Sequence, residues 1–75
     1  MVEKYRGFIP ANSIWYKLDK QETITLLKHQ GEFENLTLEE QKGVDSAEIQ
    51  GIPGKIEEVE QTLINAGLNI VTLYD

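Results

Sequence analysis

Residues 51–74 have the sequence GIPGKIEEVEQTLINAGLNIVTLY, and this stretch carries the clearest structural pattern of the chain. The glycines and the proline at its start interrupt any earlier element, and proline is well accepted near the start of a helix. Ile56, Val59 and Leu63 then follow at helical spacing and predict an amphipathic helix. A glycine ends this pattern, and the apolar run at 68–74 predicts a buried strand.

Upstream of this stretch, residues 13–18 alternate in the manner of a strand and contain aromatic and β-branched side chains. Asp19, followed three residues later by Glu22, has the spacing of a capping box. We therefore expect a helix over residues 20–30, which ends near a glycine. Three β-branched residues lie in this segment, and they leave a strand over 22–27 as the alternative.

Two further strands are expected between the helices, at 33–40 and at 44–52. The order of elements is then strand, helix, strand, strand, helix, strand. A βαββαβ chain of this length predicts an α+β fold of the ferredoxin-like type, with an antiparallel sheet and two helices on one face. We expect a single domain over 13–75, preceded by an N-terminal arm at 1–12 that lacks a clear period.

Residues 47–71 resemble the first strand, helix and strand of an ACT-type regulatory domain. The similarity lies in the segment IQGIPGKI at 49–56 and in the segment AGLNI at 66–70. The resemblance implies a ferredoxin-like fold, pairing into dimers, and binding of an amino acid or another small metabolite after the first strand. It also implies that Gly51 and Gly54 lie near such a ligand.

The composition offers little material for an active site. The 75 residues include one histidine and no cysteine, which excludes a thiol nucleophile and a thiolate zinc site. His29 falls at the end of the predicted 20–30 helix, where a cation suits the helix dipole. Glu57 and Glu58 would point about 100° apart on a helix and so would not converge on one metal ion. We therefore predict a non-enzymatic protein with no cofactor and no bound metal.

The charge of the chain is acidic and unevenly distributed. Thirteen acidic and seven basic residues give a net charge of −6, which argues against direct binding to nucleic acid. Residues 1–30 carry five basic and three acidic side chains, a net of +2, whereas residues 31–75 carry two basic and ten acidic ones, a net of −8. We interpret the acidic part as a surface that docks onto a basic surface of another protein. Protection of a sheet edge by charge is the alternative.

The candidate partner-binding residues come from the acidic part and from the single tryptophan. They are Trp15, Glu34, Glu39, Glu40, Glu57, Glu58 and Glu60. Strand alternation places Trp15 on the face opposite Ile14 and Tyr16. If the Ile14 face packs under the helices, Trp15 lies on an open face as an interface anchor; in the reverse arrangement it is a core residue.

Together these features predict a small acidic protein-binding module that regulates or inhibits a partner with a basic, nucleic-acid-handling surface. A phage or mobile-element protein that blocks such a partner would fit, and an ACT-like ligand-sensing domain is the alternative. Because so short a chain without disulfides has few other sources of stability, a homodimer is also expected. The sequence has no apolar stretch near ~20 residues and no signal-peptide pattern, which predicts a cytoplasmic location and no membrane partner.

Overall fold

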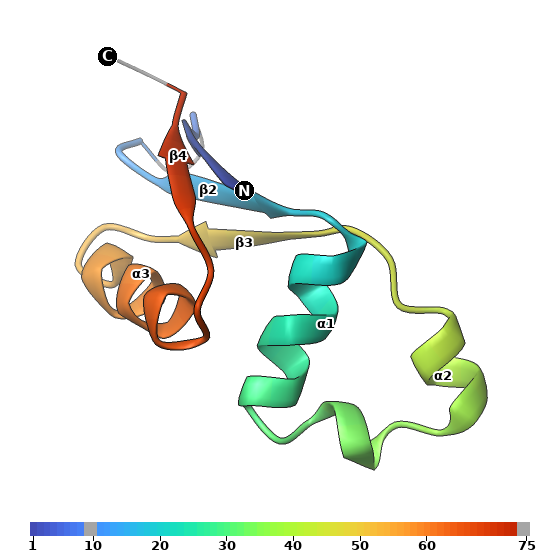
Figure 1. Ribbon diagram of the computed structural model, residues 1–75. Helices are drawn as coiled ribbons and strands as arrows, with labels where there is room; N and C mark the ends of the chain where they lie inside the picture. The colour runs from blue at the N-terminus through green and yellow to red at the C-terminus, as the bar shows by residue number, and fades with distance from the viewer. Residues whose placement is uncertain (9–10, 74–75) are drawn as a thin grey trace.

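The structure is a computed structural model that describes residues 1–8 and 11–73 (Figure 1). Part of the expected arm, at 9–10, and the end of the strand expected at 68–74 lie outside the described residues. The elements in chain order are β1 (Val2–Arg6), β2 (Ile14–Leu18), α1 (Lys20–His29), the 3-10 helix η1 (Phe33–Asn35), α2 (Leu38–Lys42), β3 (Ala47–Gly51), α3 (Ile56–Asn65) and β4 (Ile70–Thr72).

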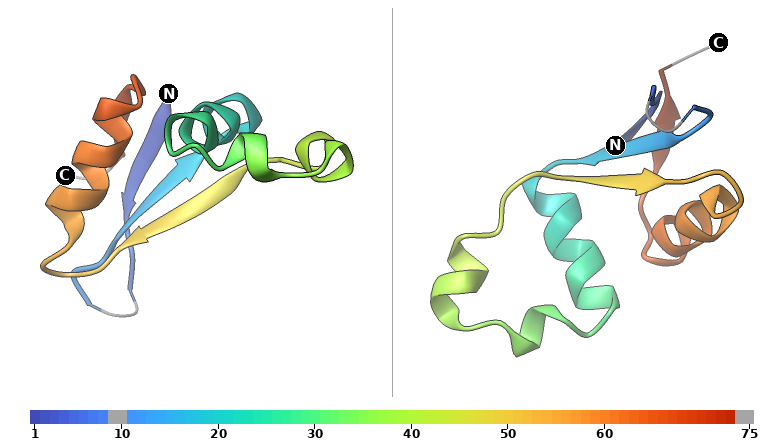
Figure 2. Two further views of the ribbon diagram at one scale, coloured as in Figure 1. Left: turned by 90° about the horizontal axis from the view of Figure 1, so that it is seen from below. Right: turned by 180° about the vertical axis from the view of Figure 1, so that it is seen from behind.

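The strands of the described part of the chain form one mixed sheet in the order β3-β2-β1-β4. β1 and β2 form an antiparallel hairpin, and β3 pairs antiparallel with β2. β4 runs parallel to β1 on the other side, after α3 has crossed beneath the sheet. α1 and α3 lie on the same face of the sheet, and within the described residues the opposite face carries no helix (Figures 1 and 2). The fold is therefore α+β, as predicted.

The core lies between the sheet and these two helices. In β2 every second side chain is buried, namely Ile14, Tyr16 and Leu18, because a strand alternates its side chains between the two faces. Leu26 of α1 and Leu63 of α3 pack against them from below. This arrangement settles the two alternatives for β2: the face with Ile14 is the one under the helices.

The predicted capping box of α1 is confirmed. The Asp19 carboxylate accepts a hydrogen bond from the backbone N–H of Glu22 at 2.8 Å, and the Glu22 carboxylate accepts one from the N–H of Asp19 at 3.0 Å. Together the two bonds satisfy amide groups that the first turn of a helix leaves unpaired. Gly31 follows the helix with φ +73°, a conformation that glycine adopts without strain. The alternative strand over 22–27 is therefore wrong.

The prediction of a strand at 33–40 was wrong, and the ferredoxin-like βαββαβ order fails with it. Residues 33–35 form η1, and α2 begins at Leu38. Thr37 and Glu40 form a second capping box, with N···O distances of 3.1 Å and 2.9 Å. This local arrangement stabilises a helix start and outweighs the alternation of two leucines.

The sheet of the described residues nevertheless has four strands, because the segment expected to be an N-terminal arm forms one of them. Val2–Arg6 forms β1, which lies inside the sheet between β2 and β4. Its pairing with β4 is parallel, so the predicted all-antiparallel sheet is also wrong. The sequence of β1 does not show the alternation of a half-buried strand, because the charged Lys4 occupies a position on the helix-covered side. There the carboxylate of Glu60 in α3 neutralises it.

Candidate functional site

The acidic candidate residues separate into two groups at opposite ends of an elongated molecule of 39 × 21 × 20 Å. One group lies on η1 and α2, which project away from the sheet, and the other lies on α3 (Figure 1). We call residues 32–45 the acidic lobe. It contains five carboxylates and one lysine. The candidate glutamates therefore lie on separate elements of the fold.

The acidic lobe is held in shape mainly by its own polar contacts. The amide of Gln41 donates hydrogen bonds to the carbonyls of Phe33 at 3.0 Å and of Leu36 at 3.3 Å. The ammonium of Lys28 lies 5.2 Å from the centre of the Phe33 ring, which attaches the lobe to the end of α1 through a cation–π contact. No residue of η1 or α2 is buried. The lobe is thus an ordered projection rather than part of the core.

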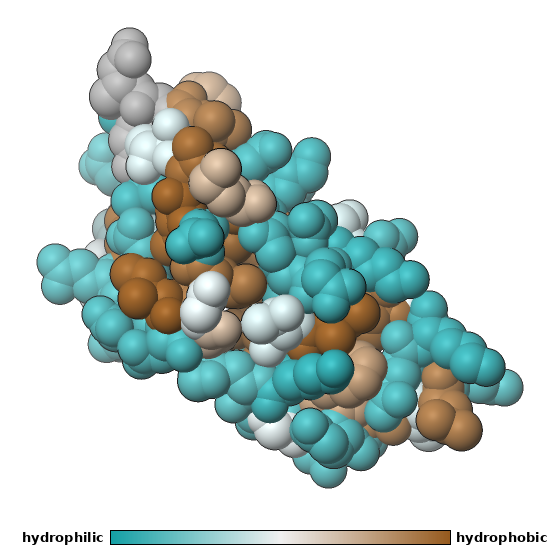
Figure 3. Space-filling view, in the orientation of Figure 1, coloured by the Kyte–Doolittle hydropathy of each residue, from teal (hydrophilic) through white to brown (hydrophobic). Residues whose placement is uncertain are grey.

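The surface of the lobe combines free carboxylates with an exposed apolar side chain. Glu34 and Glu39 are exposed, and none of the ion pairs among the described residues involves a lobe carboxylate. Glu40 is exposed too, although its carboxylate also caps α2. Leu38, at the first position of α2, is 75% exposed. Figure 3 shows this end of the molecule as mainly hydrophilic, with a small hydrophobic area.

Of the three glutamates of α3, Glu60 has a role inside the fold. Glu60 accepts a hydrogen bond from the ammonium of Lys4 at 3.0 Å, and the two side chains are only 29% and 15% exposed. Glu58 lies 3.6 Å from Lys55, whereas Glu57 is exposed in the first turn of the helix. Since the Glu60 carboxylate neutralises a cation on the covered side of β1, it is engaged within the domain rather than presented to a partner.

Trp15 lies on the sheet face opposite the buried Ile14 and Tyr16, and it is half-buried there. It pairs in register with Tyr5 of β1 and with Gln50 of β3. Its indole covers Gly7, because a Cβ built at that glycine would lie 2.5 Å from the indole nitrogen and closer still to Ser13 Oγ. Trp15 therefore closes the end of the β1–β2 hairpin, on the opposite side of the sheet from the helices.

The neighbouring Tyr5 titrates in an unusual environment. Burial raises the pKa of its hydroxyl above 10.0, and a hydrogen bond to Glu48 and the negative charges of Glu48 and Glu3 raise that pKa further. Because the pKa is higher in the folded chain, the contribution of Tyr5 to stability is present below pH 10 and is lost as the pH rises through the folded pKa.

We expect Glu48→Gln to bring the pKa of Tyr5 back towards 10.0, because the substitution removes the charge and weakens the accepted hydrogen bond. The measurement is an NMR titration of the Tyr5 ring carbons from neutral to alkaline pH. Glu58→Gln, which removes a carboxylate from α3, is the control and should leave the Tyr5 midpoint unchanged. A titration midpoint of Tyr5 that is the same in Glu48→Gln as in the unmodified chain would contradict this account of the site.

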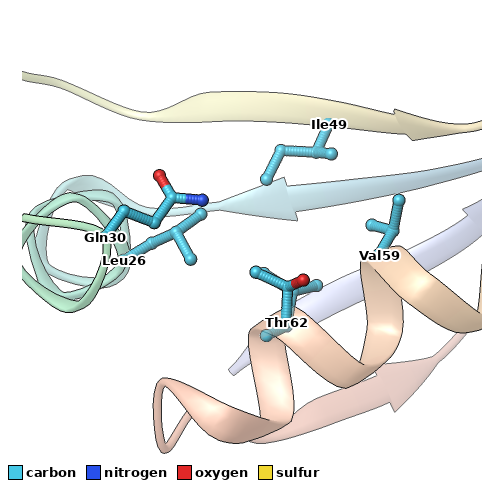
Figure 4. A pocket seen from close by; sticks show the side chains of 6 residues that line it. Leu26, Gln30, Ile49, Val59 and Thr62 are labelled. Atoms are coloured by element: carbon cyan, nitrogen blue, oxygen red, sulfur yellow. The ribbon is translucent and has the colours of Figure 1, made fainter. Parts of the chain in front are cut away.

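An apolar groove separates α1 from α3 beneath β3 (Figure 4). It encloses about 200 Å³, and its lining residues are Leu26, Gln30, Ile49, Val59, Thr62 and Leu63. Ile49 points into the groove from the sheet, while the other side chains come from the two helices (Figure 4). The helical spacing of Val59 and Leu63 marked them as core residues but gave no sign that the helices diverge here.

The two glycines implied by the ACT resemblance have structural roles. Gly51 is buried, and a Cβ there would touch Tyr16 and Ile56 at 3.4 Å. Gly54 has φ +92°, the left-handed region that glycine favours, and it lines a second cavity of about 520 Å³ with Ile56 and Glu57. The strand, helix and strand that the resemblance implies are present as β3, α3 and β4.

Comparison with known protein families, with curated proteins and with solved structures found no match for this chain. The class of protein therefore rests on its own fold, a small α+β domain with a mixed sheet and a projecting acidic lobe. Within residues 1–8 and 11–73, no three acidic or histidine side chains gather in a way that could hold a metal ion. Nor does any helix in that part of the chain have the length and apolar character to cross a membrane.

Proposed function

We propose that this chain is a non-enzymatic, cytoplasmic protein-binding module whose acidic lobe docks onto a basic surface of another protein. The observation that carries the proposal is the projection of the lobe: an ordered segment whose helices bury no residue and whose carboxylates form no ion pair among the described residues. Such a segment adds little to the stability of the core. Its net charge of −4 over residues 32–45 instead suits attraction of a cationic partner.

Leu38 supplies the apolar part of the proposed contact. A leucine that is 75% exposed at the first position of α2 gains free energy when a partner covers it, on the order of 2 kcal/mol for full burial. The flanking carboxylates of Glu34 and Glu39 would steer the partner and select for basic side chains around the pocket that receives Leu38. The lobe thus offers an exposed apolar side chain together with exposed carboxylates, the two kinds of contact that protein interfaces combine.

The class of partner follows from the charge. A protein with a strongly basic surface is most often one that handles nucleic acid, since cationic side chains neutralise phosphates. We therefore infer that the chain regulates or inhibits a nucleic-acid-handling protein by covering part of its basic surface. A phage or mobile-element inhibitor would act in this way, because occupation of that surface excludes the nucleic acid without catalysis.

The test is an affinity capture. The chain is immobilised, a lysate of the source cell is passed over it, and the retained partner is eluted with increasing salt. We expect Glu34→Gln/Glu39→Gln to release the partner at clearly lower salt, with roughly ten-fold weaker binding at low ionic strength. Glu57→Gln/Glu58→Gln is the matched control, because it removes the same charge from α3 and should bind as the unmodified chain does. Glu40 is left intact because its carboxylate caps α2.

Equal losses of partner binding in the two double variants would mean that only the net charge of the chain matters. The lobe would then have no special role in binding. Leu38→Ala adds an independent readout, because it leaves every charge in place. If the partner's affinity is unaffected by Leu38→Ala and by the lobe variant alike, docking through the lobe is excluded.

A further inference from the structure

β3 (Ala47–Gly51) is an edge strand whose outer side has no neighbouring strand among the described residues. Edge strands leave backbone N–H and C=O groups available for pairing, and proteins usually protect them with proline, lysine or inward-pointing charges. β3 contains no proline and no lysine, and its one charged side chain, Glu48, lies on the sheet face without helices, opposite Lys17. The edge at β3 is therefore open to another strand.

The helix-covered side of the same edge is apolar. Ile49 is half-buried and points into the groove between α1 and α3 (Figure 4), and Leu26, Val59 and Leu63 line the same groove. A strand added beside β3 would extend the roof of this groove. An apolar side chain on that strand would then cover the exposed part of Ile49.

The sequence of β3 is complementary to itself in one antiparallel register. When a two-fold axis passes through Ile49, the two copies of Ile49 face one another on the groove side. On the other face Glu48 then lies opposite Gln50 of the second copy, a carboxylate opposite an amide that can donate to it. A two-fold axis through Glu48 would instead bring two glutamates together, and an axis through Gln50 would place Ile49 opposite Gly51.

We propose that the chain forms a homodimer by antiparallel pairing of β3 with β3 of a second copy, centred on Ile49. The two sheets become one continuous sheet, and the paired Ile49 side chains close the adjoining ends of the two apolar grooves. The contact is small, since strands of this length with a few apolar side chains bury less than the roughly 1,000 Å² of a stable interface. We therefore expect a dissociation constant on the order of 10–100 µM.

The first test is sedimentation velocity over a concentration series from roughly 1 µM to 1 mM, with NMR shifts followed in parallel. The expected result is a monomer that converts to a dimer, with the concentration-dependent shifts confined to 47–51 and the groove. A chain that stays monomeric to the top of the series overturns the proposal. So does a dimer whose shifts fall on the acidic lobe or on β4.

Substitutions at Gln50 then test the register. Gln50→Glu places a glutamate opposite Glu48 of the second copy twice in each dimer, and should raise the dissociation constant roughly ten-fold. Gln50→Lys forms two opposite-charge pairs and should lower it by a similar factor. Glu48→Gln/Gln50→Glu exchanges the two residues, restores the original pairing and should return the constant to within about two-fold of the starting value.

Thermal unfolding of each variant at low concentration checks that the monomer itself is intact. This register would be excluded if Gln50→Glu and Gln50→Lys changed the dissociation constant in the same direction. It would also be excluded if the dissociation constant of the exchanged variant did not return towards the starting value. The lobe variant Glu34→Gln/Glu39→Gln should dimerise normally, because its substitutions lie outside β3. The dimer and the proposed partner-binding function can therefore fail independently.

Discussion

Replacement of Leu63 with alanine is expected to lower the free energy of unfolding by about 3 kcal/mol. Leu63 is 1% exposed and joins α3 to the buried residues of β2. Alanine has a higher helix propensity than leucine, so the loss reports on packing and not on the helix itself. Because a domain of this size is stabilised by only about 5–15 kcal/mol, this one substitution removes a large share of the total.

Urea unfolding followed by circular dichroism measures the effect of Leu63→Ala. Ile64→Ala is the matched control, since Ile64 is the next residue of the same helix and is 54% exposed. We expect the control to change the free energy of unfolding by less than about 0.5 kcal/mol. Similar losses for the two variants would mean that α3 does not face the sheet through Leu63.

Gly7→Ala is expected to destabilise the fold by about 1–3 kcal/mol through a steric clash. An alanine Cβ would lie 2.5 Å from the indole nitrogen and 2.6 Å from Cδ1 of Trp15, separations that real contacts do not reach. Trp15 would have to leave its place over the β1–β2 hairpin. Since it is the only tryptophan, its fluorescence reports this movement directly, as a red-shifted emission in the folded variant.

Gly43→Ala is the control for this substitution. Gly43 ends α2 with φ −85°, and a Cβ added there would lie 3.4 Å from its nearest obstacle, the Glu39 carbonyl oxygen. We expect it to change stability by no more than about 0.5 kcal/mol, because alanine adopts this conformation without strain. Unchanged emission and unchanged stability in Gly7→Ala would show that Trp15 does not pack over Gly7.

Part of the candidate site could be predicted from the sequence. The excess of carboxylates after residue 31 identified the acidic half of the chain, and the alternation in 14–18 placed Trp15 on the face opposite Ile14 and Tyr16. Which of those two faces is the core was decided only by the position of the helices. The grouping of the glutamates could not be predicted. Glu39 and Glu60 differ in structural role because one projects on the lobe while the other neutralises Lys4, and that distinction depends on residues distant in the chain.

The sequence by itself determined the elements whose signals are local. The capping box at Asp19 and Glu22, the apolar spacing of α3 and the alternation of β2 each lie within a few residues, so a short window of sequence is enough to recognise them. The tertiary structure decided the rest: the place of β1 inside the sheet, the parallel pairing with β4, the groove between the helices and the open edge at β3. These features depend on contacts between distant segments, such as Lys4 with Glu60, whose free energy no short window of sequence contains.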